Sequence, residues 1–355
     1  MTSIPDYKIK SNIMNNLYKN FKIAVVGATG NVGREMLNIL AERGFPLENV
    51  TALASERSVG HEVSYGEEGI LKVQNLDLYN FKGTHIALFS PGASVSAVYV
   101  PKATTAGCVV IDNTSHFRMD PDVPLVIPEI NPEAIADYKK RNTIANPNCS
   151  TIQLAMVLKP LHDFAKIKRV VASTYQSVSG AGKEAMDELF NQTRALFVND
   201  AIESHCFPKQ IAFNAIPHVD MFLPDGQTKE EWKMTVEIKK IIDPSISVTA
   251  TCVRIPVFIG HAVSANIEFH DPITPKDARK KLQVFPGISV IDDPAENRYI
   301  TPVECTGDDA VFVSRIRADK TIQNGLNVWI VADNVRKGAA LNAIQIAQIL
   351  MKNFF

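Results

Sequence analysis

A chain of 355 residues is too long for one ordinary hydrophobic core, so we expect two domains. With 46% hydrophobic and 21% charged residues, the composition is that of a soluble globular protein, and a net charge of -1 argues against nucleic acid or an anionic membrane as a partner. Five cysteines, none of them in a CxxC pair, argue against a disulfide framework and a structural zinc site. We therefore expect no bound metal and a reducing, cytoplasmic environment.

The first twenty residues are polar and rich in Asn and Lys, and they lack the apolar centre of a signal peptide. We expect residues 1–20 to form a loosely ordered extension. No apolar run reaches the length of about eighteen residues that a membrane-spanning helix needs. The sequence therefore predicts no membrane association.

A glycine-rich turn follows the first strand. Residues 21–26 form an apolar strand, residues 27–33 read GATGNVG, and a helix is expected to begin near Arg34. Such a turn lets the backbone approach a pyrophosphate closely, although the spacing is GxxGxxG rather than GxGxxG. A glycine turn that binds nothing is the alternative. The residues that we expect to contact a dinucleotide here are Gly27, Thr29, Gly30, Asn31, Val32 and Gly33.

The second strand, residues 50–54, ends where NAD-specific folds usually place a carboxylate for the ribose. Here the strand is followed by Arg57 between Ser55 and Ser58, a set that suits a 2′-phosphate. We therefore expect NADP in preference to NAD. The alternative is a solvated arginine in a loop.

Two more strands, residues 85–90 and 108–112, alternate with helices and predict a doubly wound parallel sheet of the Rossmann type. Ser90 and Gly92 follow the first of these strands and are expected to face the nicotinamide side of the cofactor. The segment 333–355 is predicted to be one helix that returns to this domain. The cofactor domain is thus expected to comprise residues 21–148 and 333–355.

A cysteine is delivered to the start of an apolar helix by the turn NPNCST, residues 146–151. A thiol in a first helical turn faces unpaired N–H groups and the positive end of the helix dipole, both of which favour the thiolate. We interpret Cys149 as a nucleophile. A structural cysteine at the start of a core helix is the alternative.

The character of the chain changes after this helix. Residues 169–176, 232–238 and 247–257 are predicted to be strands of an antiparallel or mixed sheet. Residues 149–332 are therefore expected to form a second domain of the α+β class.

Several polar residues of this second domain are candidates for the site. Arg254 lies in an apolar, strand-like run, where a guanidinium requires a carboxylate or phosphate partner. His261 is expected to be exposed by the glycine turn that ends this run. Gln176 could orient a carbonyl, or it could belong to a flexible turn. Glu237 and Lys240, taken alone, suit a solvated charge cluster.

Five motifs in this order resemble the aspartate-β-semialdehyde dehydrogenase family. They are GATGNVG at 27–33, NPNCSTIQ at 146–153, QSVSGAGKEA at 176–185, EEWKMTVEIKKI at 230–241 and RIPVFIGHA at 254–262. This resemblance extends from residue 21 to about residue 350. It implies NADPH-dependent reductive dephosphorylation of L-aspartyl-4-phosphate to the semialdehyde, a step toward lysine, diaminopimelate, threonine and methionine, by a homodimer or a tetramer.

The resemblance also implies a role for each matching residue. Cys149 would be the nucleophile, His261 the acid/base and Gln176 the group that positions the thioester carbonyl. Arg254 would bind the substrate carboxylate, Glu237 its amino group, and Arg118 and Lys240 the phosphate. Ser179, Gly180 and Asn334 would lie beside the cofactor.

Rival functions remain at this point. An N-acetyl-γ-glutamyl-phosphate reductase shares the cofactor domain, the cysteine and an acyl phosphate substrate, but its acetylated substrate has no ammonium for a glutamate to bind. A glyceraldehyde-3-phosphate-type dehydrogenase has a different turn after its cysteine. A non-catalytic NADP-binding sensor with a structural Cys149 is the rival from another class.

Overall fold

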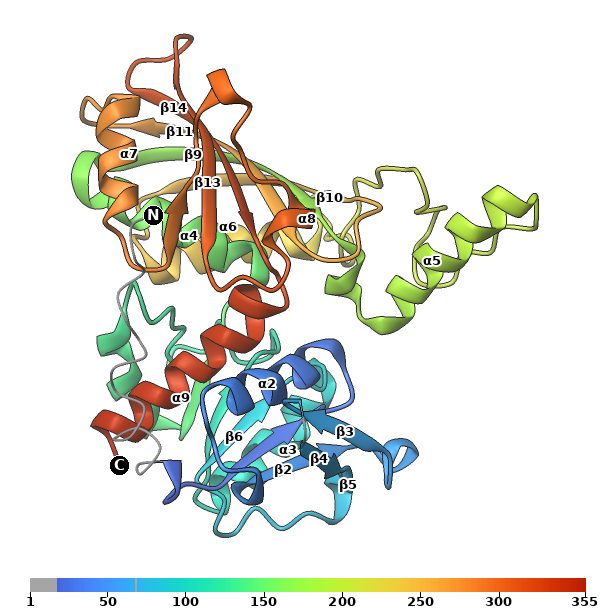
Figure 1. Ribbon diagram of the computed structural model, residues 1–355. Helices are drawn as coiled ribbons and strands as arrows, with labels where there is room; N and C mark the ends of the chain where they lie inside the picture. The colour runs from blue at the N-terminus through green and yellow to red at the C-terminus, as the bar shows by residue number, and fades with distance from the viewer. Residues whose placement is uncertain (1–17, 68) are drawn as a thin grey trace. The chain divides into compact units, whose positions relative to one another are not determined.

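The computed structural model describes residues 18–67 and 69–355, which divide into two compact units (Figure 1). The first unit comprises residues 18–128, Pro132–Asn146 and Ala340–Phe355. The second comprises Glu129–Asn131 and Pro147–Ala339. Most of the predicted extension, residues 1–17, lies outside the described residues.

The first unit is built on a six-stranded sheet in which all neighbouring strands are parallel. The order is β5 (Gln74–Asn75), β2 (Val50–Ala54), β1 (Ile23–Val26), β6 (Ile86–Phe89), β7 (Val109–Asp112) and β8 (Thr143–Ala145). This order confirms the predicted doubly wound sheet. The strand order reverses at β1, and ligands of such sheets bind beyond the carboxyl ends of the strands at that point.

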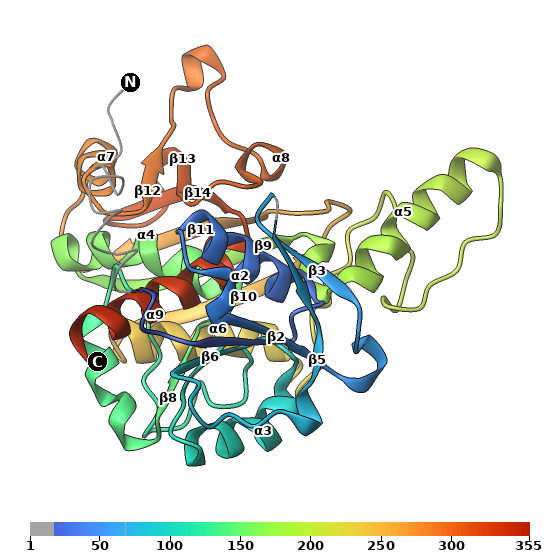
Figure 2. The ribbon, with the colours of Figure 1, turned by 60° about the horizontal axis from the view of Figure 1, so that its bottom comes forward.

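Helices cover both faces of this sheet. Figure 2 shows α2 (Asn31–Glu42) and α9 (Leu341–Asn353) on one side of the strands and α3 (Ala93–Thr105) on the other. The helix after the glycine turn begins at Asn31, slightly earlier than expected, with Gly30 in an extended conformation as its N-cap. A small antiparallel pair, β3 (Glu62–Tyr65) and β4 (Gly69–Lys72), completes the unit.

The C-terminal segment is not the single helix predicted over residues 333–355. Residues Arg336–Ala340 form a π-helical turn, and only then does α9 begin. Asp333 stands before the turn, where its carboxylate accepts hydrogen bonds from the backbone N–H groups of Val335 (2.8 Å) and Arg336 (2.9 Å). These bonds cap the turn, so Asp333 marks the start of the helical segment and is not part of it.

The second unit contains a six-stranded mixed sheet, as predicted. Its order is β10 (Ser247–Arg254), β9 (Ile167–Gln176), β11 (His261–Phe269), β14 (Gly325–Ala332), β13 (Val311–Asp319) and β12 (Ile288–Val290). The two outer pairs, β10 with β9 and β12 with β13, are parallel, and the inner pairs are antiparallel.

The strand predicted over residues 232–238 is wrong, because this segment belongs to the helix α6 (Lys229–Ile241). Thr228 and Glu231 form a capping box that starts the helix. The buried residues of α6 recur at helical spacing, which places them on one face: Glu230, Met234, Glu237, Ile238 and Ile241.

Two further helices pack against the mixed sheet: α4 (Cys149–Ala165) contacts α6, and α7 (Pro275–Gln283) contacts α4, β12 and β13. The short α8 (Pro302–Cys305) lies near β14. In contrast, α5 (Lys183–Val198) and the segment that follows it stand apart from the strands in both views (Figure 1 and Figure 2).

None of the helices in residues 18–67 and 69–355 is long and apolar enough to cross a membrane. In the same residues, no group of three or more His, Cys, Asp or Glu side chains is placed to hold a metal ion. No disulfide joins any two of the five cysteines.

Candidate active site

Cys149 is the first residue of α4, at the end of the NPN turn. The side-chain oxygen of Asn148 caps the helix by accepting hydrogen bonds from the N–H groups of Ser150 (2.9 Å) and Thr151 (3.2 Å). Cys149 is only partly exposed. The π-helical turn passes beside it, because a Cβ added to Gly338 would lie 3.0 Å from the Cβ of Cys149. The predicted position of the cysteine at the start of a buried helix is confirmed.

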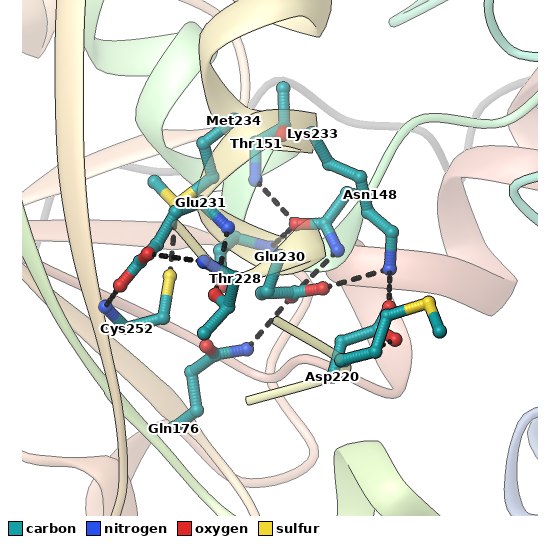
Figure 3. A network of polar contacts seen from close by, with 12 residues as sticks. Asn148, Thr151, Gln176, Asp220, Thr228, Glu230, Glu231, Lys233, Met234 and Cys252 are labelled. Atoms are coloured by element: carbon teal, nitrogen blue, oxygen red, sulfur yellow. Dashed lines mark hydrogen bonds and ion pairs between the residues drawn. The ribbon is translucent and has the colours of Figure 1, made fainter. Parts of the chain in front are cut away.

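A buried carboxylate lies at the centre of a hydrogen-bond network next to this turn (Figure 3). Oε1 of Glu230 accepts hydrogen bonds from the side-chain amides of Asn148 (2.8 Å) and Gln176 (3.1 Å). Its Oε2 accepts one from Nζ of Lys233 at 3.0 Å, and Lys233 also donates to Asp220 at 2.6 Å. Glu230 thus ties Gln176 to the residue that precedes Cys149.

The network keeps Glu230 charged. Burial by itself would raise the pKa of this carboxyl, but the Lys233 ammonium and the donated hydrogen bonds outweigh it and bring the pKa to about 2. Burial likewise opposes the charge of Lys233, yet the carboxylates of Glu230 and Asp220 raise its pKa. The site therefore contains a buried negative charge with a cation beside it.

Arg254 and His261 approach a common point. A Cβ added to Gly180 would lie 3.2 Å from Nη1 of Arg254 and 3.2 Å from Nε2 of His261. Both side chains are buried, and within the described residues Nε of Arg254 and Nε2 of His261 have no hydrogen-bond partner. The expectation that a glycine turn exposes His261 is wrong, because His261 begins the central strand β11 and is covered.

The other ring nitrogen of His261, Nδ1, is hydrogen-bonded. Nδ1 accepts a hydrogen bond from the backbone N–H of Ser177 at 3.0 Å, so the neutral ring carries its proton on Nε2. Burial and, after it, the positive charge of Arg254 lower the pKa of His261 to about 3. Asn334 and Ser179, which were expected beside the cofactor, are buried and hydrogen-bonded to each other and to the Ser177 hydroxyl.

Glu237 and Lys240, the predicted ligands of the ammonium and phosphate, follow Glu230 and Lys233 by about two turns along α6. Glu237 is buried, and its Oε2 accepts the backbone N–H of Asn148 at 2.7 Å. Lys240 is partly exposed in the last turn of the helix. The sequence reasoning missed Glu230 and Lys233 because it treated the segment as a strand. The TKEE capping box, residues 228–231, was the signal that could have revealed the helix and its buried face.

The glycine turn of the first unit has the geometry that a phosphate-binding loop needs. Gly27 has φ +85°, and a Cβ there would lie 2.9 Å from the backbone of Ser90. At Gly33 a Cβ would lie 2.1 Å from the carbonyl oxygen of Gly27, so only glycine fits between turn and helix. Thr29, Gly30, Asn31 and Val32 complete the turn and the start of α2. These residues suit a dinucleotide pyrophosphate.

The remaining predicted cofactor and phosphate residues also lie in the first unit. Ser55 and Arg57 are exposed and Ser58 is partly exposed, directly after β2. Gly92 is the N-cap of α3, beyond the carboxyl end of β6. Arg118 is buried and donates from Nη2 to the carbonyl of Asn113 at 2.8 Å. The phosphate role of Arg118 stays a prediction.

Comparison with known proteins identifies the family. Residues 22–138 match the family described as "Semialdehyde dehydrogenase, NAD binding domain", and residues 158–337 match "Semialdehyde dehydrogenase, dimerisation domain". The aspartate-semialdehyde dehydrogenase of Aquifex aeolicus is 53% identical over 335 residues, covering 94% of this chain and 98% of the relative. The chain belongs to the aspartate-semialdehyde dehydrogenase family. It is therefore an oxidoreductase of amino-acid biosynthesis.

Solved structures of the family have the same fold. Aspartate semialdehyde dehydrogenase II of Vibrio cholerae, complexed with ASA, has a TM-score of 0.92 and 49% identity, covering 95% of this chain and 99% of that one. The enzyme of Candida albicans, solved with NADP, has a TM-score of 0.71 and 25% identity, covering 93% and 98%.

Proposed function

We propose that this enzyme reduces L-aspartyl-4-phosphate to L-aspartate-4-semialdehyde with NADPH, through a thioester on Cys149, as a step toward lysine, diaminopimelate, threonine and methionine. The observation that carries the proposal is the buried Glu230 network beside Cys149, opposite in charge to the substrate ammonium. The Vibrio cholerae relative was solved in complex with ASA. An N-acetylated substrate has no ammonium, so a buried anion argues against the N-acetyl-γ-glutamyl-phosphate reductase.

The charged groups of the second unit match the rest of the substrate. Arg254, with its unpartnered Nε, supplies a planar fork for the α-carboxylate. Lys233, which lies beside Glu230, supplies a positive charge for the phosphate. We assign the ammonium to Glu230 and the phosphate to Lys233 in place of Glu237 and Lys240, because Glu230 is hydrogen-bonded to the side chains of both Gln176 and Lys233.

The chemistry begins with attack of the Cys149 thiolate on the acyl carbon, which breaks the bond to phosphate and forms the thioester. The amide of Gln176, held by Glu230, would position the thioester carbonyl. Bound NADPH supplies the hydride. His261 then moves the proton at the former carbonyl oxygen, and the thiohemiacetal releases the aldehyde and the thiolate.

The glycine turn at residues 27–33 would hold the cofactor pyrophosphate, and Arg57 with its two serine neighbours would hold the 2′-phosphate that distinguishes NADP from NAD. The cysteines, none of which forms a disulfide, suit a reducing compartment, and we propose that the enzyme acts in the cytoplasm.

We also propose that the enzyme is a homodimer or a dimer of dimers. The second unit matches a dimerisation domain, and α5 with its following loop exposes large apolar side chains. These are Phe190, Leu196, Phe197, Val198 and Phe213. Apolar surfaces of this kind are typical of subunit interfaces.

The deciding assay follows NADP reduction by aspartate semialdehyde. We expect turnover only with phosphate or arsenate present, because either anion must release the acyl group from Cys149. Cys149→Ala should lose turnover by a factor of about 10³ or more while it still binds NADP. Turnover without either anion would exclude an acyl phosphate product, and N-acetylglutamate semialdehyde serves as the rival substrate. NADP binding without any turnover in wild type would favour the sensor.

A further inference from the structure

Two groups of one residue approach Nδ1 of His261. The backbone N–H of Ser177 lies 3.0 Å from Nδ1, and the Ser177 hydroxyl oxygen also lies 3.0 Å from it. A backbone N–H can only donate, whereas a hydroxyl can donate or accept. Ser177 therefore offers Nδ1 a donor and an acceptor at the same distance, and both are buried.

The hydrogen atom of the Ser177 hydroxyl has a partner of its own. Oγ of Ser177 donates to Oδ1 of Asn334 at 3.0 Å. Asn334 is held in turn, because Oδ1 also accepts the backbone N–H of Gly260 at 2.9 Å and Nδ2 donates to Ser179 at 2.9 Å. With its proton on Asn334, the Ser177 oxygen can direct a lone pair toward Nδ1.

Acid–base catalysis at Nε2 requires the lone pair that the Ser177 oxygen directs toward Nδ1. While the Ser177 N–H donates to Nδ1, the neutral ring has its proton on Nε2 and cannot accept another there. To take a proton at Nε2, the ring must carry a proton on Nδ1, and in a fully buried site that N–H needs an acceptor. In the described part of the chain, the charged groups that act on His261 are Arg254 and Glu230, and neither contacts Nδ1.

We propose that Ser177 is a positioning residue that lets His261 act as both acid and base: its N–H supports the resting ring, and its hydroxyl, oriented by Asn334, accepts from Nδ1–H during turnover. This inference rests on the proposed function. On entering turnover the ring exchanges its Nε2 proton with water for one on Nδ1, which the Ser177 oxygen accepts. The Cys149 thiol gives its proton to Nε2, the thiolate displaces phosphate, and after hydride addition the Nε2 proton passes to the former carbonyl oxygen. When the C–S bond breaks, that hydroxyl proton returns to Nε2 and the aldehyde and the thiolate are released, while the Nδ1 proton stays in its hydrogen bond to Ser177.

The test compares Ser177→Ala with Ser177→Thr, which keeps the hydroxyl, and with Ser264→Ala, which removes a hydroxyl from the same strand as His261. We expect Ser177→Ala to lower kcat between about tenfold and a hundredfold with KM and NADP affinity within about twofold. The solvent deuterium isotope effect on kcat should rise, because proton transfer becomes slower. Ser177→Thr should recover most of the rate, and Ser264→Ala should match wild type.

A second measurement does not depend on activity. In protein labelled with ¹⁵N-histidine, the His261 signals, assigned by their loss in His261→Gln, should shift further toward the Nε2–H form in Ser177→Ala. Identical His261 shifts in wild type and Ser177→Ala, or unchanged kcat and isotope effect, would overturn the proposal. Absence of phosphate-dependent turnover in wild type would instead refute the proposed function, and the ¹⁵N shifts would still decide the role of Ser177.

Discussion

At the scale of single residues, the proposed site contains buried charged groups whose ionised forms are stabilised by neighbouring side chains. Glu230 is ionised because Lys233, Asn148 and Gln176 together offset the loss of water around its carboxylate. Gln176 is oriented by the same oxygen that would attract the substrate ammonium. In the proposed mechanism, substrate binding and carbonyl positioning are therefore coupled through Glu230.

Glu230→Gln and Glu237→Gln form a matched pair on one helix. Glu230→Gln removes the buried charge, and we expect kcat/KM for aspartate semialdehyde to fall between about tenfold and a hundredfold. Glu237→Gln keeps an acceptor for the Asn148 N–H and should stay within about threefold. Steady-state kinetics on both variants, with circular dichroism to check folding, decide between them. The reverse order of effects would restore the original assignment of Glu237.

Arg57 provides a test of cofactor choice. Because its guanidinium is exposed beside two serines, Arg57→Ala should weaken NADP binding about tenfold or more. NAD has no 2′-phosphate, so its affinity should change by less than about twofold. Fluorescence titration of both nucleotides measures the difference, and an equal loss for the two would remove Arg57 from the site.

At the scale of elements, the residues of the proposed site lie at the ends of helices. The first turn of α4 presents Cys149, the capping box of α6 places Glu230 and Lys233, and the π-helical turn brings Gly338 against the cysteine. In contrast, α5 stands apart from the sheet (Figure 1) and carries exposed apolar side chains. Phe197, which is 79% exposed, packs its ring edge-to-face with Phe213 at a centroid distance of 6.0 Å.

The α5 surface predicts the effect of a charge on assembly. Phe197→Asp should weaken self-association about thirtyfold or more, since aromatic anchors at interface centres contribute about 2 kcal/mol or more. Sedimentation equilibrium over a range of protein concentrations gives the dissociation constant. Leu78→Asp, at a site in the first unit with 83% exposure, is the control and should leave assembly unchanged. An unaltered constant for Phe197→Asp would place the interface elsewhere.

At the scale of the whole molecule, the buried site makes stability depend on pH. The pKa of His261 in the folded protein, about 3, lies below the ordinary histidine value of 6.5, so the unfolded chain binds a proton at a pH where the folded chain does not. Stability is therefore intact above pH 6.5 and falls as the pH drops below it. Glu230 contributes at lower pH: its pKa of about 2 in the folded protein lies below the ordinary value of 4.5, so its contribution to stability is present above pH 4.5 and is lost as the pH falls toward about 2.

The substitution His261→Gln isolates the contribution of His261 to the pH dependence of stability. Between about pH 5.5 and 4, wild type should lose about 1.4 kcal/mol of unfolding free energy per pH unit relative to the variant, and about half that slope at pH 6.5. Urea denaturation of both proteins at several pH values measures the difference. Above about pH 7.5 the two curves should run parallel, and parallel curves over the whole range would show that His261 is not held neutral by the fold.

What the sequence by itself determined is local. The glycine turn, the parallel strands of the first unit and the cysteine at the start of α4 follow from short patterns of residue size, polarity and turn chemistry. The family motifs extended these patterns to an activity. Where the local pattern was ambiguous, as in residues 232–238, a strand was expected and a helix formed.

Only the tertiary structure decided which polar groups meet. Glu230 and Glu237 lie on the same face of α6, and the fold gives one of them to Gln176 and the other to the backbone of Asn148. His261 is buried because β11 pairs with β9 and β14, and the residues next to the histidine in the sequence do not predict that pairing. Hydrogen bonds and desolvation depend on partners that are distant along the chain, so charge states and roles emerged only with the fold.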